Sequence, residues 1–168
     1  LLWFSRVCRP DIAFSVAKLS RHCVNPSKRD YDALIRIARY LYATRDLGIH
    51  FLPTPPNLPG LTTTHTHLCA YTDSDFASDT TNSRSISGAI TLLNQAPIAW
   101  YSKQQKSVAV STTEAEYNAL TSIAKSILTT REQLETMGTS TQMPPTPCYT
   151  DNTSAQTLAS TEPIRSAT

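Results

Sequence analysis

The chain has 168 residues, of which 40% are hydrophobic and 17% charged, and its formal net charge at pH 7 is +2. This length and composition are typical of one globular domain, or of one domain with a flanking segment. No apolar run approaches the roughly 20 residues of a membrane-spanning helix, and no signal peptide is apparent, so a membrane is not an expected partner. The four cysteines are scattered without a C-x-x-C pair, which predicts reduced, mostly buried thiols and an intracellular location.

Charge is distributed unevenly along the chain. Residues 1–60 hold nine Lys and Arg against four Asp and Glu, a net of +5, whereas residues 61–168 hold six against nine, a net of −3. Such a division suits a polyanionic partner at one end and a cation site at the other. Ordinary solvated surface is the simpler explanation from charge alone.

The first 52 residues are predicted to form a helical segment. Apolar residues at helical spacing follow Pro10 as far as the helix-breaking pair Asn25-Pro26. Ser27 is a suitable N-cap for a second helix that continues to about Thr44. One face of that helix carries a predicted apolar stripe: Tyr31, Leu34, Ile35, Ala38, Leu41 and Tyr42. A short strand is expected over Leu47–Leu52, and the Pro-rich stretch 53–66 predicts a linker.

From residue 67 the pattern changes to short strands and two further helices. The predicted order is three strands, a helix, a strand and a helix: Leu68–Thr72, Ile86–Leu93, Pro97–Ser102, Thr112–Met137, Cys148–Thr150 and Asn152–Ser160. Residues 94–96 form a connection of hairpin length, and Gly138 is expected to end the long helix. This order predicts an α/β fold with a mixed sheet flanked by helices.

Two of the predicted strands lead into the same tripeptide, Tyr-Thr-Asp, which ends at Asp73 and at Asp151. If these strands are parallel neighbours, their carboxylates meet at the carboxyl edge of the sheet, where open α/β sheets bind ligands. The long helix offers a third carboxylate. Glu114 fits a capping box with Ser111, whereas Glu116 is in phase with the apolar face that packs on the sheet.

Three inward carboxylates, those of Asp73, Glu116 and Asp151, would repel one another without a cation between them. Divalent cations with oxygen ligands relieve this repulsion, and Mg²⁺, with Mn²⁺ as its substitute, is the expected ion. Two such ions activate a water and stabilise the leaving oxygen of a phosphodiester. From spacing alone, ordinary surface acids are the alternative.

Five blocks of sequence stand in order along the chain, beginning at residues 71, 84, 98, 111 and 149: YTDSDFASD, RSISG, IAWYSK, STTEAEYNAL and YTDNTSA. Together they resemble the ribonuclease H region of copia-type LTR retrotransposon Pol polyproteins. Upstream, residues 9–14 and 39–41 resemble the segment that joins reverse transcriptase to that region. The resemblance therefore covers nearly the whole chain.

The resemblance implies a ribonuclease H-like domain over residues 67–168, preceded by a reverse-transcriptase connection-like segment over residues 1–52. It assigns the catalytic metal-ligand positions to Asp73, Glu116 and Asp151, and implies two-metal hydrolysis of the RNA strand of RNA–DNA hybrids. The implied partners are the hybrid and the rest of the Pol polyprotein, in a cytoplasmic particle or the nucleus. The family's fourth acidic residue and last strand would fall beyond residue 168, so a C-terminally truncated domain with weak or no activity is expected.

Candidate nucleic-acid contacts are Arg36 and Arg39 on the second helix, with Arg84 and Ser87 in the second block. A solvated helix face is an equal alternative for the two helical arginines. Packing is favoured over base stacking for the aromatic pair at residues 100–101.

Two other metal motifs are disfavoured by their spacing. The acidic run that begins at Asp73 lacks the Gly and Glu of an EF-hand loop, and the run from His65 to Cys69 lacks a second ligand pair at zinc-finger spacing. Two alternative functions stay open: a non-catalytic nucleic-acid-binding remnant, and the inactive relic of a degenerate element.

Overall fold

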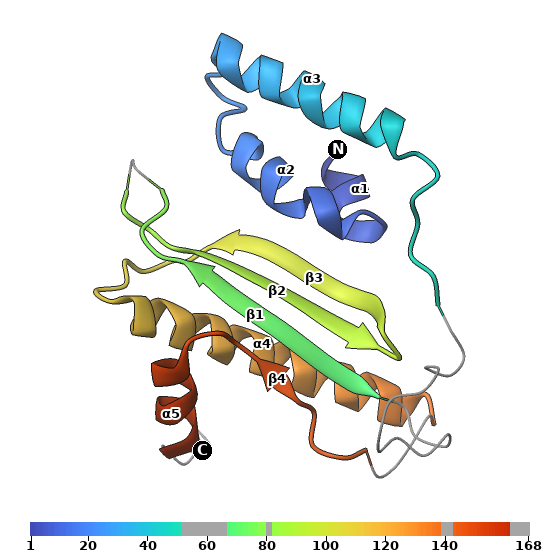
Figure 1. The fold of residues 1–168 in the computed structure, drawn as a ribbon, viewed down its shortest axis with the longest axis vertical. Coiled ribbons are helices and arrows are strands. Elements are labelled where there is room, and N and C mark those ends of the chain that lie inside the picture. Colours follow the sequence, from blue (N-terminus) through green and yellow to red (C-terminus); the bar gives the residue numbers. More distant parts are fainter. Residues whose placement is uncertain (52–66, 80–81, 139–142, 162–168) are drawn as a thin grey trace.

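A computed structural model describes residues 1–51, 67–79, 82–138 and 143–161, and the structural statements below refer to these residues. Its elements are α1 (Leu2–Val7), η1 (Pro10–Ile12), α2 (Ala13–Ser20), α3 (Lys28–Ala43), β1 (Leu68–Asp75), β2 (Ile86–Leu93), β3 (Ala96–Gln104), α4 (Thr112–Thr136), β4 (Cys148–Tyr149) and α5 (Thr153–Thr161). Four strands form one sheet with the order β3-β2-β1-β4 (Figure 1). β1 pairs antiparallel with β2 and parallel with β4. This is the predicted mixed sheet flanked by helices, and it is consistent with a ribonuclease H-like fold.

The two faces of the sheet differ because side chains alternate along each strand. In β1 the even-numbered residues from Leu68 to Ser74 are buried, whereas Tyr71, Asp73 and Asp75 are exposed. The buried face packs against α4, and helices α1 and α2 lie over the opposite face (Figure 1). The exposed residues of β1 therefore face the N-terminal helices.

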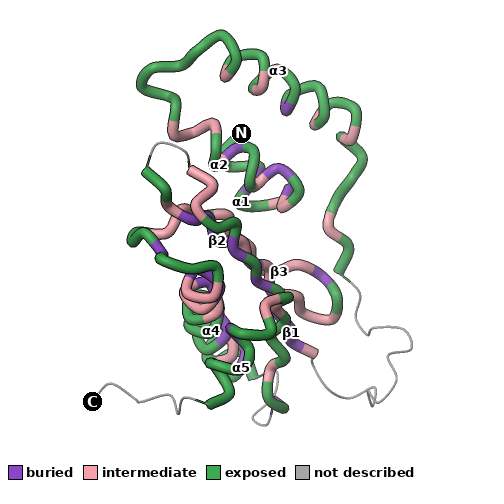
Figure 2. Tube along the Cα trace, turned by 60° about the vertical axis from the view of Figure 1, so that its left-hand side comes forward, coloured by how far each residue is buried: buried purple, intermediate pink, exposed green. Residues whose placement is uncertain are grey.

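The main core lies between the sheet and α4. Ile123 and Ile127 of the helix pack with Leu68 and Ala70 of β1, and the ring of Tyr101 packs against this cluster. Figure 2 shows buried positions along the strands and on α4, while α3 is largely exposed. The apolar face predicted for the long helix is thus the face that meets the sheet.

The N-terminal helices share a smaller core around Ile12, Val16 and Ile37. α3 begins at a capping box between Ser27 and Asp30, which confirms Ser27 as its N-cap. The apolar stripe predicted for this helix is wrong in phase, because Ile37 is its one buried residue and most of the stripe is exposed. Within the described residues, the helix packs mainly against α2, and most of its other apolar side chains are exposed.

Polar contacts attach the N-terminal helices to the sheet. The indole N–H of Trp100 donates to the carbonyl of Ser5 at 2.6 Å, in agreement with the predicted packing role of this residue. Arg21 forms an ion pair with Asp79 at 3.1 Å, and the Gln104 amide donates to the same carboxylate oxygen at 2.6 Å. The helices are therefore held over β3 at two separate points.

Several elements differ from the predicted ones, among them β3, which runs over Ala96–Gln104 and not Pro97–Ser102. The sequence does not predict α1, which begins at Leu2 and whose N-cap residue, Leu1, makes no side-chain cap hydrogen bond. Residues 47–51 form no strand, since Leu47 and Phe51 are exposed and no strand pairs with them. β1 continues past its predicted end because its pairing with β2 extends to Asp75. The predicted linker, residues 53–66, lies outside the described residues.

The cysteines, the β2–β3 turn and the character of the helices can each be compared with the prediction. All four cysteines are free, but Cys69 alone is buried, so the prediction of mostly buried thiols is wrong. Asn94 and Gln95 form the β2–β3 turn with φ angles of 49° and 70°, values that match the twist of a tight hairpin. Among the described helices, none combines the length and apolar character that crossing a bilayer requires.

Candidate metal centre

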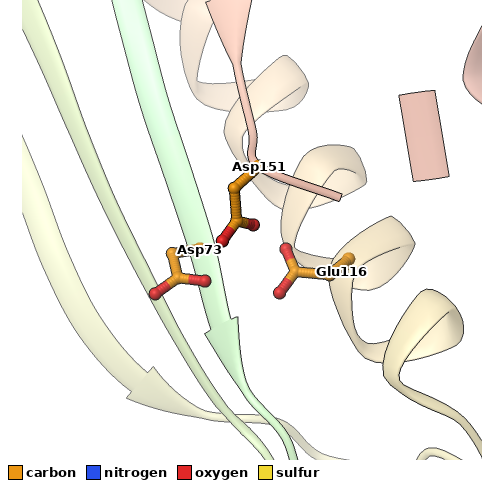
Figure 3. Close-up of side chains that lie close together, drawn as sticks. All are labelled: Asp73, Glu116 and Asp151. Carbon is orange, nitrogen blue, oxygen red and sulfur yellow. The ribbon is translucent and has the colours of Figure 1, made fainter. Parts of the chain in front are cut away.

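Three carboxylates converge at the edge of the sheet from three separate elements. Asp73 lies on β1, Glu116 lies in the second turn of α4, and Asp151 follows β4 by two residues. One oxygen of each can be chosen so that all three lie within 4.8 Å of one another. Figure 3 shows the three side chains pointing toward a common point.

The parallel pairing of β1 and β4 brings the two aspartates together. Tyr71 is in register with Tyr149, so Asp73 and Asp151 each follow a paired tyrosine by two residues. β4 ends at Tyr149, and Asn152 then accepts the amide of Ala155 at 2.9 Å at the start of α5. The strands are parallel neighbours, as the tripeptides suggested, although Asp73 lies within its strand and not after it.

Glu116 approaches the same point from the opposite face of the sheet and is only 5% exposed. Its carboxylate accepts the backbone N–H of Ser74 at 3.0 Å and the hydroxyl of Thr150 at 3.4 Å. Burial raises the pKa of Glu116 above its ordinary value, and the charges of Asp73 and Asp151 raise it further, while the Ser74 N–H opposes the rise.

Glu114, two residues earlier, has a different role. The Ser111 hydroxyl accepts the Glu114 N–H at 3.1 Å, which confirms Ser111 as the N-cap of α4. The Glu114 carboxylate accepts the N–H of Val110 at 2.8 Å, so the return contact of the predicted capping box is displaced by one residue. The two glutamates are therefore distinguished as predicted, one at the helix cap and one beside the aspartates.

Gln105 supports the site through hydrogen bonds, and this role was not predicted from the sequence. Its amide N–H group lies 3.3 Å from the Ser74 hydroxyl, 2.9 Å from the Ser87 hydroxyl and 2.9 Å from the Ala115 carbonyl. It thereby connects β1, β2 and α4 beside the carboxylates. Ser87, a predicted nucleic-acid contact, is 5% exposed and uses its hydroxyl in this network, which leaves little of it accessible to a phosphate. Gln105 directly follows the observed end of β3, but it lies three residues beyond the predicted strand end at Ser102, so no sequence pattern indicated it.

The other predicted nucleic-acid contacts lie apart from the carboxylates. Arg36 and Arg39 are exposed on α3, which lies on the far side of α2 from the sheet (Figure 1). Arg84 is half-buried in the connection between β1 and β2, where its carbonyl accepts the Asp79 N–H at 3.2 Å. Their role in binding nucleic acid stays a prediction. Of the disfavoured zinc motif, His65 lies outside the described residues.

A groove of about 850 Å³ adjoins the carboxylates on the face of the sheet that α2 covers. One wall is formed by α2 and the preceding turn, and the floor and other wall are formed by the strands. Its lining includes aromatic and acidic side chains, among them Phe14, Tyr71, Asp73, Trp100, Tyr149 and Asp151. Two of the three converging carboxylates are therefore accessible from this groove.

In the metal-free protein, Glu116→Gln is expected to raise the free energy of unfolding at neutral pH. Because the folded-state pKa of Glu116 is raised, the unfolded chain ionises first as the pH rises, and the wild type loses stability between the ordinary pKa and the raised one. Glutamine keeps the acceptor for Ser74 but cannot ionise. The variant should therefore match the wild type at low pH and exceed it above this window, as measured by thermal melts in EDTA.

Glu114→Gln is the matched control, since it removes the same charge from a position two residues away on the same helix. It is expected to lower stability by about 0.3–1 kcal/mol, because a negative charge near the helix N-terminus is favourable. A wild type that is more stable than Glu116→Gln at neutral pH, or a difference that does not change with pH, would contradict the assignment of Glu116 as the buried acid.

Comparisons with known proteins place the chain among transposon sequences. It is 38% identical over 138 residues, 82% of its length, to the retrovirus-related Pol polyprotein from transposon TNT 1-94 of Nicotiana tabacum. It is 37% identical over 150 residues to the corresponding polyprotein from transposon RE2 of Arabidopsis thaliana. The aligned segments make up 10% of each polyprotein.

A shorter relative is covered over most of its length. The chain is 37% identical over 120 residues to the secreted RxLR effector protein 161 of Plasmopara viticola, and the match takes in 78% of that protein. No protein-family model matches the chain, and no solved structure matches it significantly. The chain is therefore similar to a region of the retrovirus-related Pol polyproteins of plant transposons, and it spans about a tenth of their length.

Proposed function

We propose that the chain is a ribonuclease H-like domain that hydrolyses the RNA strand of RNA–DNA hybrids by two-metal catalysis. The observation that carries this proposal is the convergence of Asp73, Glu116 and Asp151, which come from three elements far apart in the sequence. Carboxylates that meet by fold and not by local sequence are costly to hold together, and a functional cation is the usual compensation.

The residues present fit Mg²⁺ or Mn²⁺. All three converging groups offer carboxylate oxygens, the ligands that these hard cations prefer. None of the ion pairs between described residues involves these groups, so no Lys or Arg neutralises them. Of the three carboxylates, Glu116 needs a neighbouring cation most, because its burial makes an uncompensated negative charge unfavourable.

The side chains of the site have separable tasks. Ser74 and Thr150 fix both oxygens of the Glu116 carboxylate, which holds it behind the sheet edge. Asp73 and Asp151 are exposed toward the groove, so they face an approaching phosphodiester. When bound, divalent cations supply an activated water and stabilise the leaving oxygen in an in-line displacement. Contacts to 2′-hydroxyls and to hybrid shape would select the RNA strand, with little reading of base sequence.

Three carboxylates converge among the described residues. The number of metal ligands affects the expected rate of RNA cleavage. Two-metal sites need both ions held firmly about 4 Å apart. Asp75 is exposed on the same strand face as Asp73 and lines the same groove, but it does not belong to the converging group. Cleavage by the chain is therefore expected to be slow and to require high concentrations of Mn²⁺ or Mg²⁺.

The test is cleavage of a labelled RNA–DNA hybrid by the purified chain, with duplex DNA and single-stranded RNA as controls. Slow cleavage of the RNA strand in the hybrid alone, which EDTA abolishes, is the expected result. A second measurement follows paramagnetic broadening of amide signals by Mn²⁺. Broadening should be centred on Asp73, Glu116 and Asp151; broadening around Cys69 instead would contradict the site.

A non-catalytic nucleic-acid-binding remnant is the second candidate function. It is favoured by the exposed Arg36 and Arg39 on α3 and by the net charge of +5 over residues 1–60. Hybrid binding without cleavage at any cation concentration would favour the binding function over the enzyme, and a chain that neither folds nor binds would be a relic.

For the active protein, we propose a place in the longer polyprotein beside reverse transcriptase, in a cytoplasmic particle or the nucleus.

A further inference from the structure

We propose that the groove beside the carboxylates binds unpaired nucleotides, whose bases stack on Tyr71 and Tyr149. The inference rests on the proposed function and adds a substrate class to it: a nucleic acid with a single-stranded segment next to the reacting phosphate. It concerns the surface in front of the metal centre, which the proposed reaction itself does not define.

The two tyrosines form an exposed aromatic surface. Their rings are stacked, with centroids 5.0 Å apart and an angle of 23° between the planes. Tyr71 is 46% exposed and Tyr149 is 50% exposed. The parallel pairing of β1 with β4 places the two residues in register, so the backbone keeps their Cα atoms side by side. Exposed aromatic faces of this kind bind bases of any sequence.

The groove places this surface directly beside the carboxylates. Tyr71 and Tyr149 each precede a converging aspartate by two residues, and all four side chains line the same groove. Phe14 of α2, which is 45% exposed, contributes a further aromatic ring to the lining. The volume of about 850 Å³ lies in the range of pockets that enclose small ligands, which is enough room for unpaired bases beside the reacting phosphate.

Gly88 keeps the floor of the groove open next to Asp73. It is the register partner of Asp73 on β2 and lines the groove. A Cβ atom added at Gly88 would meet no other atom within 4 Å, so packing within the protein does not require glycine here. Glycine within a strand often marks a place where a ligand approaches the backbone closely.

The charge of the groove determines how a nucleic acid would bind. Asp73, Asp75 and Asp151 line it, and its described lining contains no Lys or Arg. Phosphates are therefore repelled unless divalent cations occupy the carboxylates. Binding in this groove should require the cation, whereas binding to an arginine-rich surface does not and simply weakens as salt increases.

The experiment is fluorescence anisotropy of a labelled six-nucleotide oligouridine, titrated with the chain in Mg²⁺ and in EDTA. Binding is expected in Mg²⁺ alone. Tyr71→Leu and Tyr149→Leu should each weaken it by about tenfold, while Tyr71→Phe should retain it because the stacking face is kept. Tyr42→Leu is the matched control, since Tyr42 is 74% exposed on α3, away from the groove.

Gly88→Ala tests the groove without removing an aromatic side chain, in case either leucine variant is unstable. It should weaken oligouridine binding several-fold, and Gly48→Ala, where an added Cβ also meets nothing within 4 Å, should not. Melting curves of all variants verify that they are folded.

Oligouridine binding that persists in EDTA, or that the Tyr71 and Tyr149 variants leave unchanged, overturns the inference. So does the absence of binding by a chain that cleaves the hybrid, and the proposed function then survives without it. Conversely, cation-dependent and tyrosine-dependent binding by a chain that cleaves nothing supports the groove and removes the catalytic function.

Discussion

Replacing Asp73 with asparagine is expected to lower cation-dependent cleavage of an RNA–DNA hybrid by more than about a hundredfold. Loss of a residue that merely supports a metal ligand already costs about 10–100-fold, and Asp73 is a proposed ligand. Asparagine keeps the size of the side chain and removes its charge. The fold should be preserved, because β1 pairs with β2 over eight positions and the substitution relieves repulsion with Glu116.

The measurement compares initial rates of RNA-strand cleavage by proteins purified in the same way, which also exposes a contaminating nuclease. Asp46→Asn is the matched control, because Asp46 is an exposed aspartate remote from the sheet whose side chain is 94% exposed. A rate that Asp73→Asn leaves within a few-fold of the wild type would mean that the observed cleavage does not come from this site.

The largest effect on stability is expected from Ile123→Ala. Ile123 is 1% exposed and packs in the core between α4 and the sheet. Removing three carbon atoms from such a position costs about 2–5 kcal/mol, as lost burial and as an unfilled cavity. Urea unfolding at constant pH measures the loss, with the slope of the transition as a check that the unfolded state is unchanged.

Leu128→Ala is the control on the same helix, since Leu128 is 61% exposed. Its cost should stay within about 0.5 kcal/mol. Equal costs at the two positions would show that the helix is rotated relative to the sheet. That outcome would also undermine Glu116, whose place beside the aspartates depends on the same helical phase.

The parts of the fold that sequence periodicity predicted are those in which one face is buried against a large partner. β2 has the predicted bounds, Ile86–Leu93, and α4 begins at the predicted cap. Glu116 could be distinguished from Glu114 because the apolar residues of α4 share its phase. In these elements local pattern and tertiary burial agree, so the pattern was sufficient.

The parts that were wrong depend on neighbours that sequence does not reveal. The stripe on α3 was misplaced because, among the described residues, this helix packs mainly against α2, so burial selects Ile37 and not the broader apolar face. Residues 47–51 have strand-like composition, but no strand of the described residues pairs with them. The role of Gln105 could not be predicted from sequence, because it consists of contacts with three different elements. None of the contacted residues forms a recognisable motif with Gln105.

The short pairing of β4 has a consequence for the motions of the site. β4 pairs with β1 over two residue positions, whereas β1 and β2 pair over eight. Local opening of such a short edge strand costs less free energy than unfolding the sheet. Asp151 would then move away while Asp73 and Glu116 keep their places on β1 and α4. The assembled set of three carboxylates is therefore one state of an opening equilibrium, and any ligand that bridges Asp151 to the other two shifts that equilibrium toward the closed state.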